Sequence, residues 1–177
     1  LKHFGWSKIV NYFSDSTFIR KNIVNAKDTT VSFSGEKRNL IYIFVESLET
    51  SYASKDKGGD QNFNLLQPLM DVDPNSINFS NTEKYGGQQQ LPVMDYTAAG
   101  IIAQTSGLPL KFGGNYTQEE LRENASGKKI NNMLPGIKSL GEILKENGYT
   151  NYFLMGSYPE FGGCASYLKQ HGDYHIT

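Results

Sequence analysis

Apolar and polar positions fall into blocks along the chain, and one block is wholly apolar. Residues 40–45 form an unbroken run rich in β-branched and aromatic side chains, which ends at Glu46. Such a run is typical of a strand buried on both faces, as in parallel sheets covered by helices. We therefore predict a buried strand at 40–45, with Glu46 at the sheet edge where α/β proteins collect ligands and metals. The alternative is that Glu46 is a solvated end-of-strand residue or a helix cap.

A second apolar block follows Thr97. Residues 98–103 predict a short helix, with Thr97 at its N-cap or in its first turn and Gly107 as its C-cap. A hydroxyl in that position lies among unpaired backbone N–H groups at the positive end of the helix dipole. This setting suits a phosphate or a developing oxyanion. An ordinary threonine cap is the alternative.

The other blocks continue an alternation of strands and helices. A helix with the spacing of Trp6, Ile9, Val10 and Phe13 is predicted near the start, before a polar linker that extends to residue 38. Strand–helix alternation of this kind argues for a parallel sheet with crossover helices, and so for the α/β class. Helices are predicted to begin near 47 and to cover 63–70, 139–147 and a stretch that ends near 171; strands at 76–80 and 149–155; and loops at 54–62, 81–93 and 111–132.

Composition narrows the class of protein. The chain of 177 residues is one domain's worth, and its 17 basic and 18 acidic side chains give no sign of nucleic-acid binding. No run is long enough for a membrane helix, and no signal peptide is visible. The chain begins at Leu1 rather than Met, so we expect it to be a piece of a longer protein. Its single cysteine, Cys164, cannot form an internal disulfide.

Three ordered blocks carry a resemblance to a known family: NLIYIFVES at 39–47, YTAAGIIAQTSGLPL at 96–110 and FGGCASYLKQHGDY at 161–174. From about residue 38 onward the chain resembles the lipoteichoic acid synthase and phosphoglycerol transferase family, in the sulfatase-like branch of the alkaline phosphatase superfamily. The resemblance implies a mostly parallel sheet flanked by helices, incomplete in this chain. Residues 38–177 would be the N-terminal part of the catalytic domain, and 1–37 a juxtamembrane helix and linker.

The same resemblance implies roles for two residues. Glu46 would bind a divalent metal, and Thr97 would be both a metal ligand and the nucleophile. Mn²⁺ is the expected cofactor, with Mg²⁺ or Zn²⁺ possible. Phosphatidylglycerol would donate its glycerophosphate to the threonine, diacylglycerol would leave, and a hydroxyl of a glycerophosphate polymer or glycan would accept the group. The domain would lie outside the cytoplasm at a bacterial cell membrane, attached through helices that this chain lacks.

The chain also departs from the family pattern. The family completes its metal site with an Asp-His pair, and none of His3, His171 and His175 follows an aspartate. His171 is expected to cap or pack rather than bind metal, and the chain alone is expected to be inactive and to bind Mn²⁺ weakly. Asp95 stands beside the nucleophile, and Cys164 stands where related sequences often carry a basic residue. Cys164 is expected to be packed rather than reactive.

Three readings therefore remain open. The first is a phosphoglycerol transferase. The second is a sulfatase or phosphoethanolamine transferase of the same superfamily, although no C/S-x-P-x-R motif surrounds Thr97 and the chain is not rich in disulfides. The third is a non-catalytic binding domain that kept the fold, which Asp95 and Cys164 would support.

Overall fold

The structure is a computed structural model that describes residues 21–33, 35–72, 77, 79, 94, 96–110 and 131–177. Several predictions lie outside these residues: the first helix over most of its length, the strand at 76–80 apart from two positions, the loop at 81–93, nearly all of 111–132, and the surroundings of His3 and Asp95. The boundary proposed at residue 37 stays a prediction. Within the described residues, no helix has the length and apolar character needed to cross a membrane.

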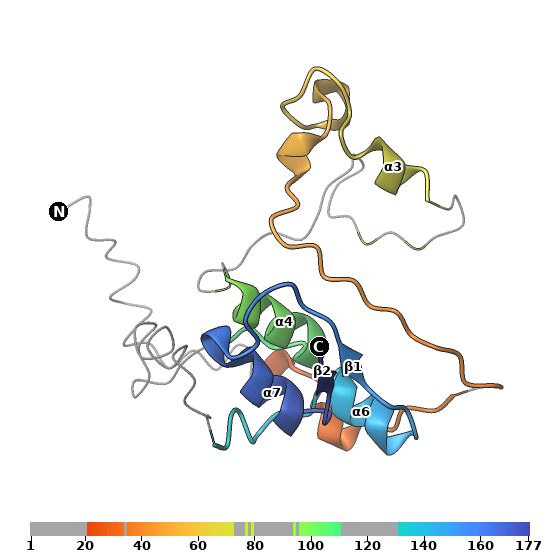
Figure 1. Cartoon of the computed structure of the whole chain (residues 1–177). Coiled ribbons are helices and arrows are strands. Elements are labelled where there is room, and N and C mark those ends of the chain that lie inside the picture. Colours follow the sequence, from red (N-terminus) through yellow and green to blue (C-terminus); the bar gives the residue numbers. More distant parts are fainter. Residues whose placement is uncertain are drawn as a thin grey trace.

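Helix α4 (Thr97–Ser106) is the longest helix of the described residues and forms one wall of the core (Figure 1). It follows the extended residue Tyr96 and ends at Gly107, which has a φ of 70°. Glycine reaches this left-handed conformation without the steric penalty of a Cβ atom, so the predicted C-cap is confirmed. The apolar residues at 98, 99, 101 and 102 are buried on the inner face of the helix.

The C-terminal part folds as helix α6 (Leu140–Glu146), strand β1 (Tyr152–Phe153), helix α7 (Cys164–Gln170) and strand β2 (His175–Ile176). Ser139 begins α6 with a capping box, in which its hydroxyl accepts from the Glu142 N–H and the Glu142 carboxylate accepts from the Ser139 N–H. The two strands pair in parallel, with Tyr152 opposite His175. The predicted helices and the predicted strand of this region are confirmed, although the strand is only two residues long.

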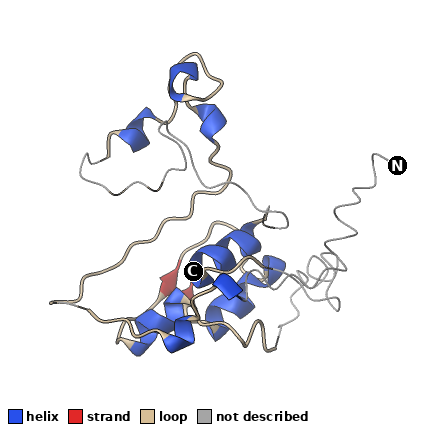
Figure 2. Ribbon diagram, turned by 180° about the vertical axis from the view of Figure 1, so that it is seen from behind, coloured by secondary structure: helices blue, strands red, loops and turns tan. Residues whose placement is uncertain are grey.

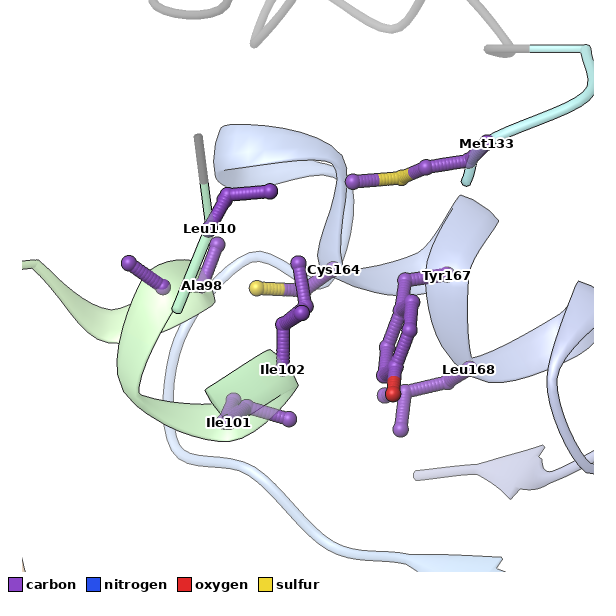
Figure 3. Packing of buried hydrophobic residues seen from close by; sticks show 9 residues of the cluster. Ala98, Ile101, Ile102, Leu110, Met133, Cys164, Tyr167 and Leu168 are labelled. Carbon is purple, nitrogen blue, oxygen red and sulfur yellow. The ribbon is translucent and has the colours of Figure 1, made fainter. Parts of the chain in front are cut away.

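A small parallel sheet with helices beside it is compatible with the predicted α/β class (Figure 2). The core lies between α4 and α7, where Ile102 faces Cys164, Tyr167 and Leu168 (Figure 3). The only polar tip among these side chains, the Tyr167 hydroxyl, lies 2.7 Å from the Thr105 hydroxyl of α4. This bond joins the two helices and satisfies a polar group that would otherwise be buried without a partner.

The predicted buried strand at 40–45 is wrong for this structure. The stretch crosses the molecule as an extended segment without strand pairing, and Ile41 and Val45 are 83% and 57% exposed (Figure 1). Within the described part of the chain, none of its backbone groups bonds to a neighbouring strand. A strand buried on both faces needs a ladder on its edges and helices over its faces. Here only Phe44 packs against the core.

The segment beyond this stretch consists of short turns. It contains the 3₁₀ helices η2 (Thr50–Tyr52) and η3 (Lys55–Lys57) and the single-turn helix α3 (Gln67–Met70), and a further 3₁₀ turn, η1 (Ala26–Asp28), precedes it in the chain. The helices predicted near 47 and at 63–70 are thus present only as single turns. The loop predicted at 54–62 is tied at its ends by a bridge between Ser54 and Gln61.

Alanine substitutions at two glycines of the core region are expected to change the free energy of unfolding in opposite directions. A Cβ atom at Gly141 of α6 would lie 2.5 Å from the Tyr174 ring and 2.7 Å from the His171 carbonyl, whereas one at Gly100 of α4 would meet nothing within 4 Å. Gly141→Ala should therefore lower the free energy of unfolding by about 1–3 kcal/mol through overpacking. Gly100→Ala should raise it by up to about 1 kcal/mol, because alanine favours a helix interior. Denaturant unfolding of both variants checks this, and equal effects would contradict the packing described for α6.

Candidate functional site

Glu46 and Thr97 are 51 positions apart in sequence and in direct contact in space. The Thr97 hydroxyl donates to the Glu46 carboxylate, with Oγ1 2.7 Å from Oε1 and 2.8 Å from Oε2. The two side chains that the sequence singled out thus meet at one spot on the accessible surface of the molecule. Because the hydroxyl hydrogen is directed at a carboxylate, the threonine has a proton acceptor in place.

Local backbone geometry explains how each side chain is presented. Thr97 is the first residue of α4, and the N-cap position belongs to Tyr96, which has no side-chain capping bond. Thr97 therefore lies in the first turn, one of the two predicted positions, and its hydroxyl bonds Glu46 rather than the helix backbone. Ser47, directly after Glu46, has a φ of 60°. A non-glycine residue in the left-handed region is uncommon, and such residues cluster at functional sites.

The start of α4 adds a positive electrostatic contribution to the site. The first intrahelical bond joins the Gly100 N–H to the Tyr96 carbonyl, so the N–H groups of residues 97–99 precede the hydrogen-bonded ladder. The first turn contains no acidic residue. N–H groups outside the intrahelical ladder and the helix dipole together favour an anion at this end. An anion there would lie within reach of the Thr97 hydroxyl.

The 3₁₀ turn η5 (Phe161–Gly163) packs against the first turn of α4. Gly162 is buried with a φ of 61°, and a Cβ atom there would lie 3.3 Å from the Ala98 Cβ atom. Gly163 is also left-handed, with a φ of 79°. The Gly-Gly pair lets the backbone approach α4 closely beside Thr97, which a bulkier residue would prevent. This turn holds the first turn of the helix in place.

Cys164 lies just after that turn and is 2% exposed. Its sulfur points toward α4, near Ala98 and Leu110 (Figure 3). Burial raises the pKa of the Cys164 thiol to about 11, and the negative charge of Glu46 contributes in the same direction. The prediction that this cysteine is packed rather than reactive is confirmed, because the thiolate is the reactive form.

His171 also serves the core. Its Nδ1 lies 2.9 Å from the Glu142 carboxylate and its Nε2 lies 2.7 Å from the Met133 carbonyl. The ring is buried and packs against Tyr167. Both ring nitrogens thus have protein partners, which confirms the expectation that His171 packs. His175 on β2 stacks on Tyr152, with ring centroids 5.1 Å apart.

The described residues contain no group of three or more His, Cys, Asp or Glu side chains that could hold a metal ion. Glu46 and the Thr97 hydroxyl together offer three oxygen atoms at one spot. These are hard ligands of the kind that Mg²⁺ and Mn²⁺ prefer. The pair could therefore form one side of a cation site.

Sequence reasoning missed a second contact between the same two segments. The Tyr42 hydroxyl donates to the Gln104 side-chain oxygen at 2.9 Å. Gln104 comes seven residues after Thr97, and that spacing places both side chains on one face of α4, two turns apart. The helical spacing was visible in the sequence, but nothing there indicated that Tyr42 would be the partner.

The burial of Cys164 gives a testable expectation. With a folded-state pKa of about 11 against an ordinary value of 9, the folded protein retains the thiol proton that the unfolded chain loses. The contribution of this thiol to the free energy of unfolding is therefore fully present below pH 9, and it is lost as the pH rises from 9 through 11. The free energy of unfolding of the wild type should therefore fall more steeply between pH 9 and 11 than that of Cys164→Ala. Equal slopes in denaturant titrations would contradict the buried thiol.

Comparison with known proteins agrees with the resemblance seen in the sequence. The chain is 34% identical over 152 residues to proteins named phosphoglycerol transferase I from Escherichia coli, Shigella boydii and Escherichia fergusonii. The match covers 85% of this chain and 17% of each relative, so the chain spans about one sixth of their length. No family model and no solved structure matches the chain. Its similarity to these relatives over most of its own length supports the phosphoglycerol transferase family for this chain.

Proposed function

We propose that the whole protein transfers glycerophosphate from phosphatidylglycerol to a hydroxyl of a glycerophosphate polymer or glycan, with Thr97 as the nucleophile. The observation that carries this proposal is the 2.7 Å hydrogen bond from the Thr97 hydroxyl to the Glu46 carboxylate, at the start of α4. A threonine hydroxyl is hardly ionised near neutral pH, so it needs a base or a metal to become nucleophilic. Glu46 supplies a proton acceptor, and the pair also suits a metal.

The reaction then has two balanced steps. In the first, Thr97 Oγ1 forms a bond to the donor phosphorus and gives up its proton to Glu46, while the bond from phosphorus to diacylglycerol breaks; Glu46 passes that proton to the departing oxygen, and diacylglycerol leaves as the free alcohol. In the second, the acceptor hydroxyl gives its proton to Glu46 and bonds to phosphorus, the bond from phosphorus to Thr97 breaks, and Glu46 returns the proton to the Thr97 oxygen. Glycerophosphate is now attached to the acceptor. The N–H groups that precede the intrahelical ladder of α4 would stabilise negative charge on the phosphoryl oxygens in both steps.

A divalent cation, Mn²⁺ by preference and Mg²⁺ or Zn²⁺ as alternatives, would be held by Glu46 and Thr97. The fit rests on the donor set, since a carboxylate and a hydroxyl already converge on one spot. When bound, such an ion stabilises an ionised hydroxyl and polarises a phosphoryl group. Two residues are fewer ligands than these ions require, so further oxygen or imidazole ligands, water or the substrate would complete the coordination.

The wider assignments follow from the same proposal. We place the domain in the sulfatase-like branch of the alkaline phosphatase superfamily, with activity of the lipoteichoic-acid-synthase type, on the outer side of a bacterial cell membrane. The support is the agreement between the site contact and the family match. The alternative of a non-catalytic binding domain rested partly on Cys164, which stands where related sequences often carry a basic residue. Because this thiol is buried in the core, packing accounts for the cysteine without a loss of activity.

Substitution of Thr97 in the full-length protein tests the proposal. Thr97→Ala should lower glycerophosphate transfer from phosphatidylglycerol on the order of a thousandfold or more, because it removes the nucleophile. Thr97→Ser keeps a hydroxyl and should retain measurable transfer. Glu46→Gln should lower transfer strongly, whereas Glu49→Gln, which changes an exposed glutamate bonded to Ser51 in the same segment, should leave transfer near the wild-type rate. Full activity of Thr97→Ala would refute the assignment.

A further inference from the structure

The stretch that carries Glu46 is held at the site by side chains rather than by a strand ladder. Among the described residues, the backbone of 40–46 makes no hydrogen bond to another segment. Side-chain contacts at three of the described positions hold the stretch beside α4 and the core: Tyr42 to Gln104, Phe44 to the core, and Glu46 to Thr97. The position of the Glu46 carboxylate along the stretch therefore depends on these contacts.

Two of the contacts join the same pair of segments in antiparallel order. Tyr42 meets Gln104 near the end of α4, and four residues later Glu46 meets Thr97 at its start. Seven helical residues rise about 10 Å, and four extended residues span about 13 Å. The two spans match closely enough for both bonds to form at once. A shift of the stretch by one residue would break both of them.

Phe44 between them does not fix the register alone. Its ring packs edge-on against the Tyr42 ring, with centroids 4.5 Å apart, and lies 6.1 Å from the Phe153 ring of β1. Apolar contacts of this kind are non-directional, so they tolerate sliding. A hydrogen bond between a phenol and an amide oxygen has a defined length and angle, so it does not tolerate such sliding.

We propose that Tyr42 and Gln104 are positioning residues, which set the register of residues 42–46 along α4 and so hold the Glu46 carboxylate against the Thr97 hydroxyl. The functional consequence rests on the proposed function of Glu46 and Thr97, but the geometric claim does not. Catalytic and metal-binding groups must be held to within a fraction of an ångström, so a loose register would weaken the site without removing any of its groups.

The geometric claim is tested first, without reference to metal or activity. Glu46→Cys and Thr97→Cys are introduced together in the full-length protein, and the two thiols are joined with dibromobimane, which becomes strongly fluorescent only when it links two thiols. The native Cys164 is buried and its thiol pKa is raised to about 11, so it should contribute little. The variants that carry only Glu46→Cys or only Thr97→Cys, each with Cys164 in place, give the background.

Adding Tyr42→Phe or Gln104→Met to this pair should slow the cross-linking several-fold, because each removes one side of the bond and keeps the side-chain volume. The two together should slow it no more than either alone. Tyr152→Phe, which changes an exposed tyrosine of β1, is the matched control and should leave the rate unchanged. Unchanged cross-linking in both Tyr42→Phe and Gln104→Met would overturn the proposal, and thermal unfolding confirms that each variant is folded.

The functional consequence is measured in the protein with Glu46 and Thr97 intact. Tyr42→Phe and Gln104→Met should weaken Mn²⁺ binding about tenfold and lower kcat while the KM for phosphatidylglycerol stays near the wild-type value. A merely structural role would not separate kcat from KM in this way. If Glu46→Gln leaves Mn²⁺ binding unchanged, the metal assignment fails; slower cross-linking in the two variants would still support the register proposal.

Discussion

The packing of α4 against α7 is the constraint on which the candidate site depends. Ile102 fills the space beside Tyr167 and Leu168, and the buried bond between Thr105 and Tyr167 joins the two helices. These contacts fix the helix against the core. The turn η5 then supports the first turn of the helix through the close approach of Gly162 to Ala98. Thr97 is thus presented by a helix that is packed into the core, as the nucleophile role proposed for it would require.

Glu46 reaches the same spot by a different means. Its segment is extended and largely exposed, and side-chain contacts to α4 and to Phe153 determine where it lies. The site therefore joins a rigid half, supplied by a packed helix, to a half held by a few directed bonds. On the proposed function, this asymmetry is the reason that a contact as distant as that of Tyr42 with Gln104 would affect chemistry at Thr97.

The sequence predicted the parts of the fold that depend on local signals. Ser139 and Glu142 specify the start of α6, Gly107 specifies the end of α4, and the apolar block after Thr97 specifies that helix. The sequence did not predict the exposure of residues 40–45. An apolar run indicates that a segment is suited to burial, but it does not indicate whether a partner strand and covering helices are present. The meeting of Glu46 with Thr97 was expected from the family resemblance, whereas the bond between Tyr42 and Gln104 depends on tertiary packing that no local pattern encodes.

In the proposed reaction, Thr97 carries the transferred group. Mass spectrometry of the full-length protein tests this role directly, on protein that is incubated with phosphatidylglycerol alone, quenched and digested into peptides. A glycerophosphate adduct is expected on the peptide that contains Thr97, and it should be lost when acceptor is then supplied. Transfer at the wild-type rate without an adduct at Thr97, or with the adduct on another residue, would contradict it.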